Sequence, residues 1–155
     1  MATTRAPREP GGVKTADLVR LVGQTRRALW IAAARALASQ GESVVAWSLV
    51  NRLAELGPLT QRELADASAQ HPAGVSRQLD DLEARGLTTR EADPGDRRRR
   101  RVGLTPQGVR WHRRWRPVVD AATGPVLSPL RAPQRRALAA LLREIVRPGA
   151  ARRAR

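Results

Sequence analysis

A run of five arginines, Arg97 to Arg101, follows the turn sequence Asp93-Pro94-Gly95-Asp96. Guanidinium groups present planar pairs of donors that match phosphate oxygens and the edge of guanine. The turn lies between residues 87–92 and 99–104, which we expect to pair as two strands. The arginines would then occupy the tip of a hairpin, where they can reach a groove of double-stranded DNA.

A second candidate for reading DNA is the segment from Pro72 to the glycine at position 86. Proline suits the first position of a helix, and Val75, Leu79 and Leu82 recur on one face of it. The opposite face begins with small and polar side chains and becomes acidic further along, at residues 80–83. We therefore expect the N-terminal end of this helix to approach the phosphates.

The residues predicted to contact DNA fall into three groups. The start of the preceding helix contributes Thr60 and Gln61, the helix from Pro72 contributes His71, Ala73, Gly74, Ser76, Arg77 and Gln78, and the hairpin contributes Asp96, Arg97, Arg98, Arg99 and Arg100. For His71 two roles stay open: a helix cap or phosphate contact, which we favour, and a contact with a base.

The composition agrees with a polyanionic partner. The formal net charge is +15, and 29 residues are lysine or arginine against 14 acidic ones. An arginine-rich solubilising surface explains part of this excess, but not its concentration at the hairpin tip. The chain contains no cysteine, and its two histidines lack metal-ligand spacing, so we expect no metal, no cofactor and no catalytic residue.

No membrane association is expected, because no apolar run approaches the roughly 20 residues of a membrane-spanning helix. The N-terminus also lacks an apolar signal core. We therefore expect a cytoplasmic protein.

The elements that must position these residues follow from hydrophobic periodicity. It predicts helices over 15–39, 43–56, 60–67, 72–85, 105–123 and 133–147, with a kink at Pro117. The fold is thus mainly α with one small β-hairpin, an α+β class. The apolar stripes of the first and the last two helices exceed what one small core can bury, which predicts a dimer.

The order of elements resembles the MarR family of bacterial transcriptional regulators over residues 16–146. The motifs that carry the resemblance are Leu59-Thr60-x-x-Glu63-Leu64-Ala65, Val75-Ser76-Arg77-x-Leu79-x-x-Leu82-Glu83-x-x-Gly86-Leu87, Asp93-Pro94-x-Asp96-x-Arg98 and Val102-x-Leu104-Thr105-x-x-Gly108. The resemblance implies a winged helix-turn-helix, with the helix from Pro72 in the major groove. It also implies that Arg98 enters the minor groove and that Asp96 orients it.

The resemblance divides the chain into five parts. These are a disordered N-terminal tail (1–12), a dimerisation helix (13–40), the winged helix-turn-helix domain (43–105), C-terminal dimerisation helices (106–147) and a basic tail (148–155). A homodimer of this kind would bind a pseudo-palindromic operator.

The resemblance further implies a small aromatic or phenolic ligand in a crevice between the dimerisation helices and the DNA-binding lobe. The candidate walls are Trp30, Trp47, Trp111 and Trp115, and the candidate anion anchors are Arg26, Arg27 and His112. The alternative is that the tryptophans fill a core in a chain that has no Phe or Tyr.

The function predicted from the sequence is that of a homodimeric, sequence-specific regulator of transcription, a repressor more often than an activator in this family, and not an enzyme. One alternative is an architectural, nucleoid-type protein that binds DNA with little sequence preference. Another is an interaction module or small enzyme on the same scaffold, which the arginine-rich hairpin disfavours.

Overall fold

A computed structural model describes residues 12–68, 70–93, 95–96 and 98–146. Apart from Gly12, the predicted tails lie outside these residues, as does Arg97 of the predicted hairpin tip. The elements are α1 (Thr15–Ala38), α2 (Val44–Leu56), β1 (Leu59–Thr60), α3 (Gln61–Ser68), α4 (Pro72–Ala84), β2 (Thr88–Ala92), β3 (Arg100–Leu104), α5 (Pro106–Thr123), a 3₁₀ turn (Gly124–Leu127) and α6 (Ala132–Val146).

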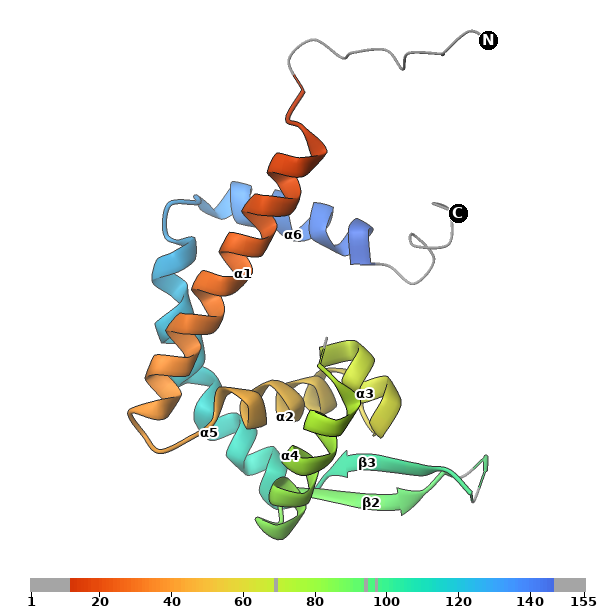
Figure 1. Cartoon of the computed structure of the whole chain (residues 1–155). Coiled ribbons are helices and arrows are strands. Elements are labelled where there is room, and N and C mark those ends of the chain that lie inside the picture. Colours follow the sequence, from red (N-terminus) through yellow and green to blue (C-terminus); the bar gives the residue numbers. More distant parts are fainter. Residues whose placement is uncertain (1–11, 69, 94, 97, 147–155) are drawn as a thin grey trace, which may run out of the picture.

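The predicted fold class is confirmed: the chain is mainly helical, with one small antiparallel sheet. Figure 1 shows α2, α3, α4 and the sheet gathered into a winged helix-turn-helix lobe, from which α1 and α5 extend toward α6. None of the helices in the described part of the chain is long and apolar enough to cross a membrane.

The core of the winged lobe is built from the apolar stripes of α2, α3 and α4. Its most deeply buried side chains are Leu49, Val50, Leu64, Val75, Leu79, Leu82 and Val102. Each recurs at helical spacing or, for Val102, on the inner face of β3, so binary patterning alone brings them together. This core fixes which face of α4 is turned outward.

The helices of this lobe begin at polar caps. The hydroxyl of Ser43 accepts hydrogen bonds from the backbone N–H groups of Val45 and Ala46, at 3.2 and 3.3 Å. The predicted capping box also forms: Glu63 N–H donates to the Thr60 hydroxyl at 3.2 Å, and Thr60 N–H donates to the Glu63 carboxylate at 2.8 Å. Such caps satisfy donors that the first turn of a helix leaves unpaired.

The sheet has three strands in the order β1-β3-β2, one more than the hairpin predicted from the sequence. The additional strand, β1, places Leu59 opposite Val102 and Thr60 opposite Arg101. Two residues are too few to show an alternating pattern, and the same residues carry the cap of α3. The prediction of two strands was therefore incomplete.

The hairpin joins α5 at a very close backbone approach. A Cβ atom added at Gly108 would lie 2.0 Å from the carbonyl oxygen of Leu87, so only glycine fits there. The Thr105 hydroxyl caps α5 by accepting from Gly108 N–H at 3.0 Å, and it donates to the carbonyl of Gly86 at 2.6 Å. These contacts fix α5 against the base of the hairpin.

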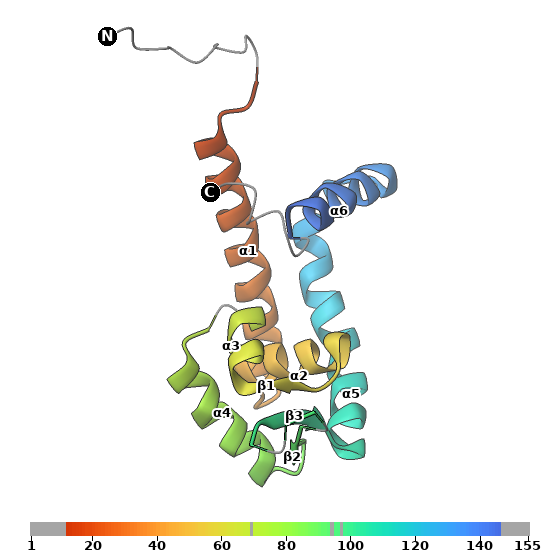
Figure 2. The same cartoon turned by 90° about the vertical axis from the view of Figure 1, so that its right-hand side faces the viewer.

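A second core lies between α1, α2 and α5, where Ala33, Leu37, Trp47, Trp115 and Val119 are buried. α5 is a single helix that includes Pro117, and the kink expected at this residue stays a prediction. The N-terminal half of α1 and α6 differ from this core, because most of their apolar side chains are exposed, among them Val19, Leu141 and Ile145. Figure 2 shows these two helices extending away from the winged lobe.

Candidate nucleic-acid interface

The outward face of α4 is set by its cap and its buried stripe. His71 Nδ1 accepts a hydrogen bond from Ala73 N–H at 3.3 Å, which is the capping role raised from the sequence. Because Val75 and Leu79 are buried, the opposite face is turned toward solvent. On that face Ala73 and Arg77 are exposed, and Gly74, Ser76 and Gln78 are half-buried.

The acidic end of α4 is paired with a residue of the β2–β3 hairpin, which we call the wing. The sequence analysis did not single out this residue. Arg90 of β2 contacts Asp80 at 2.7 Å and Glu83 at 2.5 Å. The hydrogen bond to Asp80 raises the pKa of the Arg90 guanidinium further above its ordinary value. These pairs hold the hairpin against α4 and offset the negative charge that would otherwise repel phosphate.

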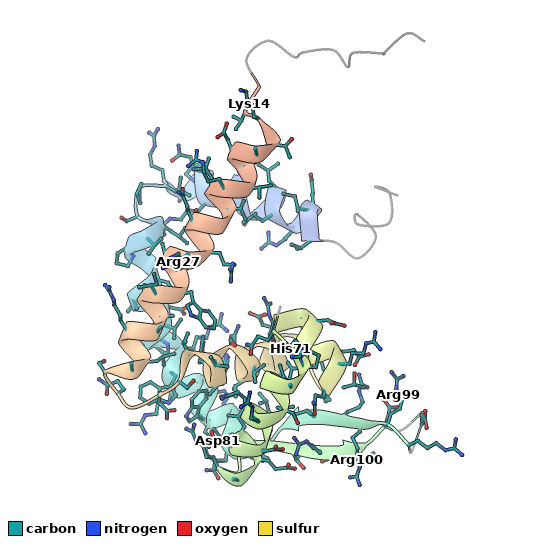
Figure 3. The ribbon with its side chains drawn as sticks, in the orientation of Figure 1. Lys14, Arg27, His71, Asp81, Arg99 and Arg100 are labelled. Atoms are coloured by element: carbon teal, nitrogen blue, oxygen red, sulfur yellow. The ribbon has the colours of Figure 1, made fainter. Side chains whose placement is uncertain are left out.

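The tip of the hairpin is closed by backbone hydrogen bonds. Asp93 N–H donates to the Arg99 carbonyl, and Arg99 N–H donates to the Asp96 carbonyl, both at 2.9 Å. The Asp96 carboxylate accepts from the backbone N–H of Arg98 at 3.0 Å, so it orders the backbone from which Arg98 extends. Arg98, Arg99 and Arg100 are exposed, and Figure 3 shows Arg99 and Arg100 on the projecting part of the hairpin.

The distribution of unpaired charge is uneven over this surface. Within the described part of the chain, no carboxylate pairs with Arg77, Arg98, Arg99 or Arg100, whereas Arg85 and Arg90 are paired with acids of α4. In Figure 3, Asp81 lies away from the hairpin tip that carries Arg99. The free cations therefore occupy the outer wing and the N-terminal half of α4.

Thr60 and Gln61, the other predicted contacts, stand at the start of α3. Hydrogen bonds from the backbone N–H and the hydroxyl of Thr60 lower the pKa of Glu63 below its ordinary value. Thr60 is thus committed to the capping box, and Gln61 is half-buried. Their contact with DNA stays a prediction.

Three of the predicted ligand-binding residues meet at a hollow between α1 and α2. A cavity of about 310 Å³ is lined by Arg26, Trp30 and Trp47, together with Ala33, Asn51 and Thr123 among others. A neighbouring cavity of about 510 Å³ shares Arg26 and Trp30 and adds Arg27, Ser68 and Gln70. An indole wall beside two guanidinium groups is suited to an aromatic anion.

The structure does not place the other three candidates on these hollows. Trp115 is buried, and Trp111 donates its indole N–H to Glu42 at 2.9 Å. The His112 ring stacks on Trp47 with centroids 5.0 Å apart, and its Nε2 pairs with the side-chain oxygen of Asn51 at 2.9 Å. Burial lowers the pKa of His112, with a smaller contribution from Arg116, so the ring is neutral near pH 7 and a poor anchor for an anion.

Sequence reasoning had no signal for the pairing of Arg90, because its partners lie 7 and 10 residues earlier in another element. In the part of the chain that the structure describes, no group of three or more histidine or acidic side chains could hold a metal ion.

Comparison with known proteins agrees with this geometry. A family model described as the MarR family matches residues 41–99. No curated protein sequence matches the chain. CouR from Rhodococcus jostii RHA1, solved bound to p-coumaroyl-CoA, is 27% identical, with a TM-score of 0.72 over 85% of this chain and 93% of the other.

Two further solved structures are similar. A MarR family protein of Mycobacterium tuberculosis in complex with p-aminosalicylic acid is 26% identical, with a TM-score of 0.69 over 83% of this chain and 97% of the other. Escherichia coli MarR, a mutant complexed with operator DNA, shares the fold at 20% identity, with a TM-score of 0.68 over 84% of this chain and 94% of the other.

Proposed function

We propose that this chain, which belongs to the MarR family of transcriptional regulators, binds a pseudo-palindromic operator in double-stranded DNA as a homodimer and represses transcription. In this role α4 enters the major groove by its N-terminal half, and the wing places Arg98 in the neighbouring minor groove. The dimer blocks the promoter sterically.

One observation carries the proposal: the division of charge across α4 and the wing. Asp80 and Glu83 are held by Arg90, and Arg77 and Arg98 are left without an acidic partner within the described residues. A surface of this kind attracts phosphate where it is free of carboxylates. The tie between Arg90 and α4 also gives the helix and the hairpin a fixed spacing, as reading two adjacent grooves requires.

The exposed apolar faces of α1 and α6 support the homodimer. Val19 is 68% exposed, Leu141 59% and Ile145 68%, which is costly for a chain that remains alone in water. A homodimer formed through these faces would bind a two-fold symmetric site if its two copies of α4 lay about one helical turn of DNA apart, roughly 34 Å.

The hollow lined by Trp30 and Trp47 is the proposed site for a small aromatic acid. The similar protein of Mycobacterium tuberculosis was solved with p-aminosalicylic acid, and that of Rhodococcus jostii with p-coumaroyl-CoA, so both ligands contain an aromatic ring. In one conformation of the dimer the spacing of the two α4 helices fits the operator, and in another it does not. A ligand that binds the second conformation more tightly would increase its population and so release the DNA.

The alternative, an architectural protein with little sequence preference, is favoured by the net charge of +15. The two functions differ in the ratio of specific to non-specific affinity. We would therefore recover bound genomic fragments and measure binding to the enriched site and to a scrambled duplex across a salt series.

A regulator should prefer its enriched site by about 10³-fold or more near 150 mM salt. Arg77→Ala should either relax the preference at one position of each half-site, if Arg77 reads a base, or weaken both duplexes equally and reduce the salt slope by about one per site, if it contacts phosphate. Equal affinity of the wild type for both duplexes would contradict the regulator and support the architectural alternative.

A further inference from the structure

Three segments that are distant in sequence meet at the C-terminal end of α4. Glu42 lies in the turn between α1 and α2, Arg85 is the residue that caps the end of α4, and Trp111 lies near the start of α5. Glu42 and Arg85 are 43 residues apart, and Glu42 and Trp111 are 69 apart. The site is distinct from both the DNA-facing side chains and the hollows.

The carboxylate of Glu42 is fully engaged by its neighbours. Arg85 Nη2 donates to both of its oxygens, at 3.1 and 2.9 Å, and the indole N–H of Trp111 donates to Oε1 at 2.9 Å. The Arg85 guanidinium also lies 5.6 Å from the centre of the Trp111 ring. With only 14% of the Glu42 side chain exposed, water competes weakly for these bonds.

This cluster holds α4 in a way that the apolar core does not. Val75, Leu79 and Leu82 supply burial, which is non-directional and tolerates small shifts of a helix along its groove. Arg90 ties α4 to the wing, but the wing belongs to the same lobe. Among the described residues, the Glu42–Arg85 pair is the polar side-chain link between α4 and the turn that ends α1.

We propose that Glu42 is the positioning residue of the recognition helix: through Arg85 and Trp111 it fixes the end of α4 relative to α1, and so relative to the second copy of the chain. The inference rests on the proposed function for its consequence in DNA binding. Because α1 carries the exposed apolar face, a movement of α1 in the dimer reaches α4 through this carboxylate. Trp111 also contacts Trp47, a wall of the smaller hollow, with ring centroids 6.2 Å apart.

The test uses Glu42→Gln, which keeps the shape of the side chain and removes its charge. The matched control is Glu55→Gln, which neutralises an exposed carboxylate of α2 that pairs with Arg52 and accepts a hydrogen bond from Asn51. At a temperature where all variants are folded, we expect Glu42→Gln to weaken binding to the enriched duplex about tenfold and Glu55→Gln to leave it unchanged. The double variant Glu42→Gln with Arg85→Gln should bind no more weakly than the weaker single variant.

A second measurement reports the position of α4 relative to α1 in the absence of DNA. The chain has no cysteine, so Arg35→Cys on α1 and Ala84→Cys on α4 provide two unique sites for spin labels. With an excess of unlabelled chain, the distance measured is the one within a single chain. Glu42→Gln should broaden this distance distribution, and Glu55→Gln should not.

Wild-type affinity and an unchanged distance distribution in Glu42→Gln would overturn the inference, as would losses of affinity that simply add in the double variant. Lower thermal stability without either change would show that the cluster is only structural. If the wild type shows no preference for any duplex, the proposed regulator fails, and the label distances still decide whether Glu42 positions α4.

Discussion

The winged lobe and the region formed by α6 and the N-terminal half of α1 contain the same types of apolar residue. These side chains are buried in the lobe and exposed in the other region. In the lobe, Leu49, Leu64 and Val75 are completely buried by other parts of the same chain. In the other region, Val19 and Ile145 are each 68% exposed, although they too lie on helical apolar stripes. The difference shows that a periodic stripe predicts a buried face without identifying what buries it.

The largest effect should come from introducing acidic side chains on the exposed apolar face of α6, which we call the open face. Leu141→Glu with Ile145→Glu places four carboxylates in the interface of a dimer, which should weaken dimerisation about 1000-fold or more, roughly 4 kcal/mol. The variant should sediment as a monomer at micromolar concentration where the wild type is a dimer. Operator binding should fall with it.

The matched control for this face is Arg136→Glu with Arg143→Glu, which places two glutamates per chain on the other side of α6. This variant should remain dimeric. If both double variants dimerise like the wild type, the open face is not the dimer interface.

A smaller effect should follow from truncating a buried side chain in the core of the winged lobe. Leu79→Ala removes a side chain that is 1% exposed, and we expect the free energy of unfolding to fall by about 3 kcal/mol. Leu56→Ala makes the same chemical change at a side chain that is 57% exposed, and it should cost well under about 1 kcal/mol. Unfolding by denaturant measures the free energy of unfolding of both variants. Equal losses in the two variants would contradict the burial of Leu79 in the core of the lobe.

The hairpin tip should contribute to DNA affinity and not to the core. Arg98→Ala should weaken binding to the enriched duplex by roughly 1–3 kcal/mol while the unfolding midpoint stays unchanged. Arg136→Ala, which removes the same charge from α6, is the control. An unchanged affinity for Arg98→Ala would show that this side chain is not used or that its neighbouring arginines replace it.

The smallest effect concerns His112, which lies where α5 packs against α2. Because burial lowers its pKa in the folded chain, the unfolded chain takes up a proton first as the pH falls below about 6.5. Its contribution to stability is therefore present above that pH and is lost as the pH decreases toward the folded pKa. Urea unfolding at pH 7.5 and 5.5 should show a smaller loss in His112→Gln than in the wild type or in His71→Gln.

The sequence predicted those parts of the fold that depend on neighbours in the chain. The stripes of α2 and α4, the caps at Ser43 and Thr60, and the turn before the arginines are local patterns, and each was found. The strand β1 was missed because two residues carry no period. The hairpin itself was found because its turn sequence is specific.

Contacts between distant elements could not be predicted in this way. The pairs of Arg90 with Asp80 and of Arg85 with Glu42 depend on how helices pack, and any of the many arginines was an equal candidate beforehand. The tryptophans show the same limit. From residue type alone, each tryptophan could line a ligand site or fill the core. Only the packing of the helices shows that Trp30 lines a cavity and that Trp115 is buried in the core.

The close approach at Gly108 has a consequence for how such a chain can diverge. Every other amino acid places a Cβ against the carbonyl oxygen of Leu87, so a change at this position must displace α5 from the base of the hairpin. In the proposed homodimer, such a displacement would move a dimerisation helix relative to the winged lobe. The exposed tip around Arg98 meets no such obstacle. We therefore expect substitutions at the hairpin tip, which would change the proposed DNA preference, to be tolerated far more readily than substitutions at Gly108.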